Sequence, residues 1–336
     1  MKTKESPFTV ATAQLAPVFL DREKTIGKVC EAIAEAATAG AKVIVFPEAF
    51  VPAYPDWVWV IPPGREKLHR ELYSELLDQS VAVPSAATEK IGRAAKAAGA
   101  YVVVGVNERN VEASGGSIYN TLLFFDDKGA LMGRHRKLIP TAAERMVWTP
   151  GDGSTLEVFD TPYGKLGGLI CWENYMPLAR YALYAWGVQI YVAATWDCAD
   201  TWVATLQHIA KEGRCTVIGS CIAMKVADVP DRYEFKELYP DPDGWMNAGN
   251  SGIVSAHGHF VAGPAEREET ILYAEIDPAD QRGMKYWNDV AGHYARPDVF
   301  QLTVNRTPNA MLNVAGGETS ANGTSPAKKP RRKVNK

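Results

Sequence analysis

In the first third of the chain, some segments have the apolar pattern of a strand, and others have apolar residues at the spacing of a helix. Residues 8–13 form a short apolar run typical of a strand, and residues 42–48 form another. Between them, Asp21 is placed to cap a helix whose apolar residues recur at helical spacing until Gly40. This order is typical of the βαβ unit of a parallel sheet.

The same order returns further along the chain, with a hairpin inserted. Ser85 opens a second helix that ends at Gly99, ahead of the β-branched run 101–106. The runs 118–125 and 130–137 then flank a short turn rich in Asp and Gly, which predicts antiparallel pairing. The later pattern predicts helices over 177–186 and 202–212 and strands over 165–170, 188–193 and 216–222.

Helices that alternate with strands must cover the faces of sheets, so the chain is expected to be an α/β protein. Periodicity alone does not decide between one sheet and two. The segments 54–79 and 226–249 break the pattern, and we expect both to be long irregular loops with a functional or interfacial role. With 336 residues and 46% hydrophobic content, one large domain over 1–315 is expected, followed by a flexible basic tail over 316–336.

Composition argues against several classes of protein. The formal net charge of −3 is too small to indicate a nucleic-acid partner. The sequence shows neither a secretory signal nor an apolar run long enough for a membrane span. Five cysteines without metal-binding spacing speak against disulfides and zinc, so we expect a cytoplasmic protein with no metal and no cofactor. The basic run 328–333 fits either a nuclear-localisation or nucleic-acid patch or a solvated tail, and the nearly neutral body favours the tail.

Three predicted strands end in residues that can carry chemistry. Cys171 follows the apolar run 165–170, Glu48 follows a proline at the end of the second strand, and Lys137 ends a basic run. Taken singly, the cysteine would be a core residue and the other two would be solvated surface charges. Open α/β sheets, however, carry their active sites at the carboxyl ends of strands.

Taken together, these residues resemble the nitrilase superfamily of carbon–nitrogen hydrolases. The family's Glu-Lys-Cys triad is matched by Glu48 in Phe-Pro-Glu, Lys137 in His-Arg-Lys and Cys171 in Cys-Trp-Glu. The resemblance extends from about Thr9 to about Asp298. The residues that follow the cysteine, and the motifs Ala143-Glu144-Arg145 and Gly292-His293-Tyr294, are similar to the nitrilase branch proper. The resemblance implies a four-layer α-β-β-α sandwich.

A nitrile carbon is a weak electrophile, so the resemblance implies a thiolate nucleophile at Cys171, with Glu48 as general base. Lys137 would favour the thiolate and, with the backbone N–H of Trp172, stabilise charge that develops on the nitrile nitrogen. Glu144 matches the family's second glutamate, which positions water or the lysine; alternatively it is a helix-start carboxylate near Thr141. Glu173 competes for the role of base, but a structural role in the turn is favoured.

The sequence leaves the substrate side chain open. Tyr54, Trp172 and Trp196 are candidates to line a pocket for an apolar substituent, although large aromatic residues are more often core. The favoured function is hydrolysis of an organic nitrile to the carboxylic acid and ammonia. An amidase or carbamoyl hydrolase with the same triad, or a non-catalytic assembling scaffold, are the alternatives. The resemblance also implies self-association into dimers that extend into spirals or filaments.

Overall fold

The computed structural model describes residues 6–312 and contains two sheets. The first has the order β13-β1-β2-β3-β4-β5, with β1, β2 and β3 parallel and the remaining neighbours antiparallel. Its strands are β1 (Phe8–Gln14), β2 (Ala41–Val45), β3 (Tyr101–Arg109), β4 (Ile118–Phe125), β5 (Leu131–Arg136) and β13 (Thr270–Ile276). The predicted hairpin is therefore confirmed as β4 and β5.

The second sheet has the order β10-β11-β9-β8-β7-β6, and β12 pairs with β11. Its centre is parallel, because β7, β8 and β9 run in one direction. Its strands are β6 (Val158–Thr161), β7 (Gly164–Ile170), β8 (Ile190–Thr195), β9 (Thr216–Cys221), β10 (Ala223–Lys225), β11 (Trp245–Val254) and β12 (Phe260–Glu266). The strands predicted on either side of the later helices are thus present within a few residues of their expected bounds.

Alternation along the strands explains why the two sheets stack. In β2, Val43 and Val45 point into a buried cluster shared with the second sheet, whereas Ile44 points to the opposite side, toward helices. In β8, Val192 faces the same shared cluster and Tyr191 faces away from it. Each sheet therefore buries both of its faces.

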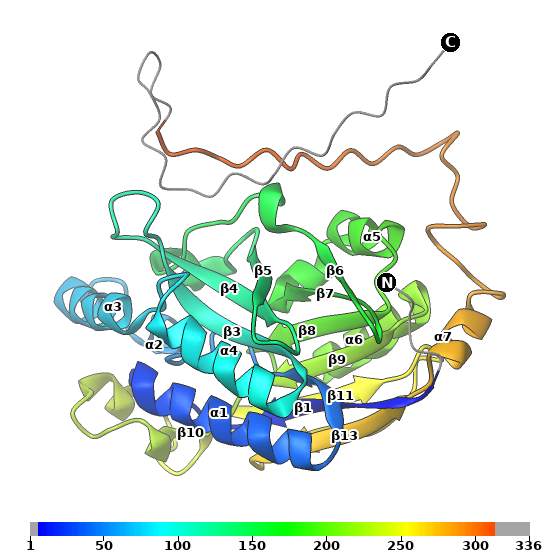
Figure 1. Cartoon of the computed structure of the whole chain (residues 1–336). Helices are drawn as coiled ribbons and strands as arrows, with labels where there is room; N and C mark the ends of the chain where they lie inside the picture. The colour runs from blue at the N-terminus through cyan, green and yellow to red at the C-terminus, as the bar shows by residue number, and fades with distance from the viewer. Residues whose placement is uncertain (1–5, 313–336) are drawn as a thin grey trace.

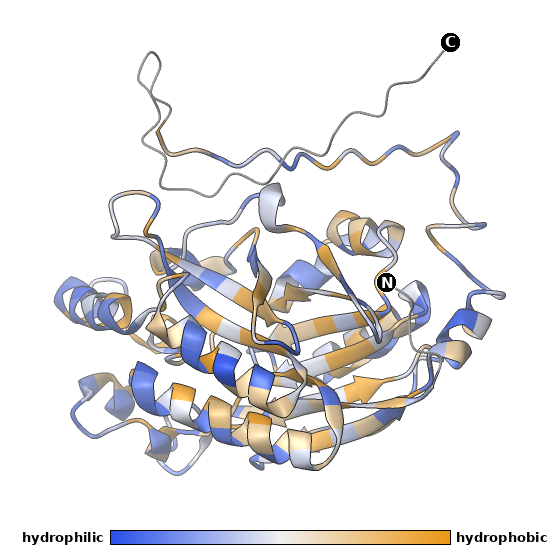
Figure 2. Ribbon diagram, viewed as in Figure 1, coloured by the Kyte–Doolittle hydropathy of each residue, from blue (hydrophilic) through white to orange (hydrophobic). Residues whose placement is uncertain are grey.

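Helices cover the two outer faces (Figure 1). The helices α1 (Arg22–Thr38) and α4 (Ala86–Ala98) pack on the first sheet, and α5 (Pro177–Ala185) and α6 (Asp200–Gly213) pack on the second. Figure 2 shows the apolar residues concentrated on the strands between these layers. The predicted four-layer α-β-β-α sandwich is confirmed.

The residues predicted to mark the starts and ends of helices are found at those positions. The Asp21 side chain accepts a hydrogen bond from the backbone N–H of Lys24, 3.0 Å away, at the start of α1. Ser85 precedes α4 as expected, and its backbone N–H donates to the Thr88 hydroxyl at 2.9 Å. Gly99 ends α4 in the left-handed conformation, which glycine adopts without steric cost.

The expectation of a long irregular loop over 54–79 is wrong. That segment contains the short helix α2 (Trp57–Val60) and the helix α3 (Glu66–Gln79). The segment does carry a helical signal, since Leu68, Leu72 and Leu76 recur four residues apart and pack on the core. The many charged residues between them and the lack of a side-chain cap obscure it. The second segment fits the expectation better: it holds two 3₁₀ turns, η4 (Val226–Asp228) and η5 (Glu234–Leu238), before β11 begins at Trp245.

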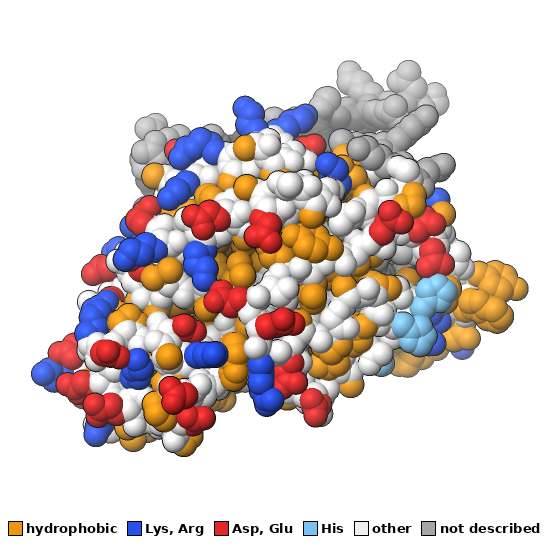
Figure 3. Space-filling model, turned by 90° about the horizontal axis from the view of Figure 1, so that it is seen from below, with side chains coloured by type: hydrophobic (Ala, Val, Ile, Leu, Met, Phe, Trp, Pro, Cys, Tyr) orange, Lys and Arg blue, Asp and Glu red, His pale blue; other side chains and the backbone are white. Residues whose placement is uncertain are grey.

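After α7 (Pro278–Met284) the described chain runs along the outside of the sandwich (Figure 1). Two contacts attach this segment to the rest of the protein. The N–H of Asn309 donates to Asp152 at 2.7 Å, and Arg306 forms an ion pair with Glu157 at 3.4 Å. The expected tail over 316–336, and the domain boundary before it, lie outside the described residues. Within residues 6–312, no helix has the length and apolar character needed to cross a membrane. On the face shown in Figure 3, acidic and basic side chains are interspersed.

Candidate active site

The three predicted strand ends meet between the sheets. Glu48 follows β2 and Lys137 follows β5 in the first sheet, whereas Cys171 follows β7 in the second and begins the 3₁₀ turn η3 (Cys171–Tyr175). Glu48 is fully buried, Lys137 is 1% exposed and Cys171 is 4% exposed. Each sheet thus contributes part of one buried cluster.

Glycine at position 105 allows Glu48 to reach this place. Gly105 lies in β3 directly against the backbone that carries Glu48, and a Cβ atom there would come within 2.0 Å of the Pro47 carbonyl oxygen. Any side chain at this position would push the loop away from β3. The close approach of loop and strand therefore positions the glutamate.

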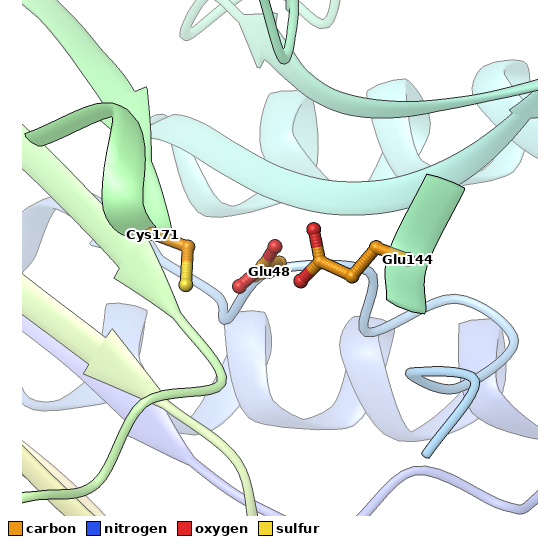
Figure 4. A group of neighbouring side chains, drawn as sticks. All are labelled: Glu48, Glu144 and Cys171. Carbon is orange, nitrogen blue, oxygen red and sulfur yellow. The ribbon is translucent and has the colours of Figure 1, made fainter. Parts of the chain in front are cut away.

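A fourth member, Glu144, joins the cluster from the 3₁₀ turn η1 (Ala142–Met146). In Figure 4 the Glu48 carboxylate lies between the Cys171 thiol and the Glu144 carboxylate. The Cys171 sulfur and one carboxylate oxygen each of Glu48 and Glu144 all lie within 4.8 Å of one another. The distance is short enough for proton transfer with small side-chain movements.

Lys137 bridges the two carboxylates. Its ammonium nitrogen lies 2.9 Å from Glu48 Oε1 and 2.7 Å from Glu144 Oε2. Burial lowers the pKa of Lys137, but the negative charges of Glu48 and Glu144 outweigh burial and raise it above its usual value. The lysine is therefore a fixed cation. Two carboxylates and a thiol could in principle hold a metal ion, but here the ammonium supplies the positive charge between the carboxylates.

Glu48 is held by two further donors. The side-chain amide of Asn120 donates to Oε1 at 2.6 Å, and the backbone N–H of Trp196 donates to Oε2 at 2.7 Å. Burial raises the pKa of Glu48; Lys137 lowers it and the neighbouring Glu144 raises it further. A carboxylate with a raised pKa is suited to accept a proton and return it.

Cys171 sits in a strained turn. Its backbone has a φ of 53°, in the left-handed region that non-glycine residues rarely adopt. Asn174 stabilises this turn, because its side-chain amide donates to the Cys171 carbonyl at 2.8 Å and its Oδ1 accepts from the Tyr191 hydroxyl at 2.7 Å. The strand-to-turn geometry directs the thiol toward Glu48 (Figure 4).

The resting thiol is neutral. Burial and the charge of Glu48 raise the pKa of Cys171, and the opposing effect of Lys137 is smaller. The sequence-based expectation that Lys137 favours the thiolate has the right direction, but the lysine alone does not ionise the thiol. The proton must therefore leave toward a base during the attack, and Glu48 is adjacent.

Glu144 fits both interpretations that the sequence left open. It completes a capping box with Thr141, whose N–H donates to its Oε2 at 2.6 Å. The same carboxylate contacts Lys137, and its other oxygen accepts from the Tyr54 hydroxyl at 2.7 Å. A capping role and a place beside the lysine are thus combined in one side chain.

Glu173 takes the structural role favoured from the sequence. It accepts from the backbone N–H of Ile170 at 2.8 Å and from that of Leu138 at 2.6 Å, and it lies 3.0 Å from the His135 ring nitrogen. These bonds join the turn that follows β7 to the segment that carries Lys137. His135 itself is 2% exposed.

The three candidate pocket residues lie in different environments. Tyr54 is buried and stacks on Trp196, with ring centroids 4.4 Å apart and an interplanar angle of 2°. Trp172 is 51% exposed, and its indole N–H donates to Asp197 at 2.8 Å. Tyr54 and Trp196 therefore contact the glutamates of the cluster, whereas the Trp172 side chain lies at the surface.

Sequence reasoning missed Asn120. Its backbone carbonyl accepts from the N–H of Lys137 at 2.8 Å, and its side chain holds Glu48, so it contacts two members of the cluster. The available signal was an amide side chain inside the mostly apolar strand β4. A buried amide in such a strand requires a partner, and the partner here is a glutamate 72 residues away.

A family model described as carbon-nitrogen hydrolase matches residues 9–286. The chain belongs to the carbon–nitrogen hydrolase family. The match spans both sheets and every residue of the buried cluster.

Relatives with curated names narrow the family to its nitrilase branch. The chain is 45% identical over 307 residues to an aliphatic nitrilase of Sinorhizobium fredii, covering 91% of this chain and 98% of that protein. It is 40% identical to nitrilase 2 of Arabidopsis thaliana, covering 88% of each. A bifunctional nitrilase/nitrile hydratase of Nicotiana tabacum is also 40% identical, over 87% of this chain and 84% of that protein. The resemblance stated from the sequence is confirmed.

Solved structures share the fold of this family member. Nit3 of Saccharomyces cerevisiae, described as a member of branch 10 of the nitrilase superfamily, matches with a TM-score of 0.66 at 20% identity, covering 88% of this chain and 99% of that chain. An amidase from Nesterenkonia sp. matches with a TM-score of 0.63 at 19% identity, covering 84% and 95%. At this identity, the likeness concerns the sandwich architecture.

Proposed function

We propose that this carbon–nitrogen hydrolase is a nitrilase that converts an organic nitrile and two molecules of water to a carboxylic acid and ammonia. The observation that carries the proposal is the Lys137 ammonium held between Glu48 and Glu144 beside the Cys171 thiol. The names of the relatives at 40–45% identity support the nitrile as substrate.

The first step forms a carbon–sulfur bond. Glu48 accepts the thiol proton as Cys171 attacks the nitrile carbon and then passes that proton to the nitrile nitrogen, which gives a thioimidate and leaves Glu48 as a carboxylate again. Because the resting thiol is neutral, transfer of its proton to Glu48 accompanies the attack. Lys137 and the backbone N–H of Trp172 stabilise the negative charge that develops on the nitrogen.

The second step releases ammonia. Water adds to the thioimidate carbon, Glu48 relays a proton to the nitrogen, and the carbon–nitrogen bond breaks to leave a thioester. A second water, deprotonated by Glu48, then attacks the thioester; the carboxylic acid departs and the thiol of Cys171 regains its proton. Glu144 holds the lysine in place through these steps, because it contacts both Lys137 and Tyr54.

An assay with paired substrates separates this function from its alternatives. A panel of aliphatic, arylaliphatic and aromatic nitriles, each paired with the matching amide, is scored for ammonia and, by chromatography, for acid and amide. A nitrilase releases ammonia from at least one nitrile much faster than from its amide. The reverse preference would make the protein an amidase or carbamoyl hydrolase, and no turnover with an inert Cys171 would favour a scaffold.

We also infer self-association and a cytoplasmic location. The two segments that interrupt the strand–helix order, residues 54–79 and 226–249, are suited to contacts between copies, and heterologous contacts that do not close give open helices. The odd number of cysteines supports a reducing compartment. Light scattering on the full chain and on a chain ending near Asn313 tests the assembly: a strictly monomeric, fully active full-length protein would contradict it.

A further inference from the structure

Arg180 is a buried arginine of the outer helix layer that the mechanism above does not use. It lies in the first turn of α5 and is 8% exposed. Its guanidinium donates hydrogen bonds to two different parts of the protein. On one side, Nε donates to Glu212 of α6 at 2.9 Å; on the other, Nη1 donates to the Asn174 carbonyl at 2.6 Å.

The carbonyl that Arg180 contacts belongs to the turn of the nucleophile. Asn174 lies in η3, which begins at Cys171, and it is fully buried. The last carbonyls of a helical turn find no partner within that turn, so a buried one needs a donor from elsewhere. Arg180 supplies this donor, and the positive charge of the guanidinium strengthens the bond.

Asn174 in turn holds the strained backbone of Cys171. Its side-chain amide donates to the Cys171 carbonyl at 2.8 Å, and its Oδ1 accepts from the Tyr191 hydroxyl at 2.7 Å. The φ of Cys171 is 53°, and a non-glycine residue stays in this region only where its surroundings hold it there. A continuous series of hydrogen bonds thus leads from Glu212 on α6 to the Cys171 backbone.

The geometry of these contacts requires an arginine. A guanidinium carries several donors in fixed directions. Nε and Nη2 both point to Glu212, at 2.9 and 3.4 Å, and Nη1 remains for the carbonyl. The Tyr184 hydroxyl donates to the same carboxylate at 2.8 Å, which fixes the anchor. A lysine has one nitrogen and cannot occupy both positions, and a methionine donates nothing.

We propose that Arg180 is a positioning residue of the active site: through Asn174 it keeps Cys171 in the conformation that directs the thiol toward the general base (Figure 4). Glu212 anchors the guanidinium on the neighbouring helix. The outer helix layer thereby contributes to the alignment of the nucleophile. The inference rests on the proposed function, because it assigns Arg180 a part in that reaction.

Two substitutions of Arg180 in the full chain test the proposal on the best nitrile of the panel. Arg180→Met should lower kcat by about 10- to 100-fold with KM changed less than about threefold, as expected when a charged hydrogen bond that orients a catalytic group is lost. Arg180→Lys should lower kcat by about 3- to 10-fold, because one nitrogen serves only one of the two partners. Circular dichroism confirms that each variant is folded at the assay temperature.

Arg214→Met is the matched control. Arg214 directly follows α6, is 7% exposed and donates to the Ala256 carbonyl at 3.3 Å, so this variant also removes a buried guanidinium from the outer layer. Its kcat should stay within about twofold of the wild type, even if its unfolding temperature changes. A loss of kcat equal to that of Arg180→Met would assign the effect to a general loosening of the layer and overturn the proposal.

A double-substitution cycle tests the route through Asn174. Once the side chain that holds the Cys171 carbonyl is removed, Arg180 has little left to position, so the two substitutions should not be additive. Arg180→Met should therefore lower kcat by less than about threefold in an Asn174→Ala background. Equal fold-changes in both backgrounds would overturn the positioning role.

A second readout separates this inference from the proposed function. Iodoacetamide alkylates a thiol: the sulfur displaces iodide from carbon, and the thiol proton passes to a base. The alkylation rate of the Cys171 peptide, followed by mass spectrometry, therefore reports the nucleophile without any nitrile. Arg180→Met should lower this rate by about tenfold or more, and Arg214→Met should leave it unchanged. A wild type whose Cys171 is alkylated but that turns over no nitrile would defeat the proposed function, and the alkylation rates would still decide the role of Arg180.

A wild-type phenotype in the Arg180 variants would also overturn the proposal. The decisive case is a folded Arg180→Met protein with the kcat and the alkylation rate of the wild type. If Arg180→Met does not fold, Arg180→Lys decides, and an unchanged kcat and alkylation rate in that variant would have the same meaning.

Discussion

Tyr54 lies flat against Trp196, and its hydroxyl donates to Glu144 at 2.7 Å. The N–H of the half-exposed Trp59 ring donates in turn to the Tyr54 hydroxyl at 3.1 Å. The sequence analysis proposed Tyr54 as a substrate contact, and its hydrogen bond to Glu144 indicates a second role. It fixes the orientation of the carboxylate that holds Lys137.

Tyr54→Phe should therefore lower kcat by roughly tenfold, because Glu144 loses one hydrogen bond while the stacked ring remains. If Tyr54 contacts only the substrate, KM should rise instead and kcat should stay constant. Steady-state kinetics on the best nitrile distinguish the two outcomes. Tyr73→Phe is the matched control, since it removes a hydroxyl that donates to the Gly116 carbonyl at 2.6 Å.

Cys171→Ala should abolish turnover and leave the fold intact, since it removes one sulfur atom and the nucleophile with it. The matched control is Cys215→Ala, which alters another buried cysteine in the cluster beneath α5 and α6 and should retain activity. Ammonia release, circular dichroism and mass spectrometry of a slow-substrate reaction provide the measurements. Residual turnover of more than a few per cent would exclude the covalent mechanism.

Lys137→Arg keeps the charge but should still lower kcat by about 100-fold or more, because a planar guanidinium cannot occupy the same point between two carboxylates. Arg134→Lys, in the same basic run but 24% exposed, serves as the control. Wild-type turnover by Lys137→Arg would remove the lysine from the mechanism.

The stability of the protein should depend on pH through Asp56, a buried acid that directly precedes α2. Its pKa is about 6 in the folded protein and 3.8 in the unfolded chain, so the folded state binds more protons between these values, and stability falls as pH rises from about 4 to 6. Replacement by asparagine removes this loss. The free energy of unfolding of Asp56→Asn relative to the wild type should rise by up to about 3 kcal/mol between pH 4 and pH 7.

Urea unfolding at several pH values measures this difference. Asp231→Asn is a control of opposite sign, since the hydrogen bond and charge of Lys236 lower the pKa of the exposed Asp231, and the stability that the pair contributes is lost toward acid pH. A difference between Asp56→Asn and wild type that does not vary with pH would show that Asp56 has an ordinary pKa.

The triad could be predicted from the sequence because its members stand where strands end. Glu48, Lys137 and Cys171 each follow a run whose period marks a strand, and the family motifs fix their order. Asn120 could not be predicted in the same way. Its role depends on a hydrogen bond to Glu48, 72 positions away, and no local pattern encodes such a pairing.

The fold, too, could be predicted from the sequence only in part. Strands and capped helices follow from local periodicity, and the stacking of two sheets follows from strands that are apolar on both faces. The helix α3 was missed although the apolar stripe Leu68, Leu72 and Leu76 packs it on the core, because charged residues dominate the rest of the segment and no side chain caps its start. The pairing of β1 with β13 joins residues from opposite ends of the described chain, and only the folded chain reveals it.

The nucleophile and the base belong to different sheets, and two hydrogen bonds between the sheets lie next to them. The N–H of Trp196, after β8, donates to Glu48, after β2, and the N–H of Leu138, after β5, donates to Glu173, after β7. A small slide of one sheet across the other would break both contacts while the strands and their ladders stayed whole. Activity therefore depends on the relative position of the two sheets. On heating, activity should be lost at a lower temperature than the far-ultraviolet circular dichroism signal of the strands.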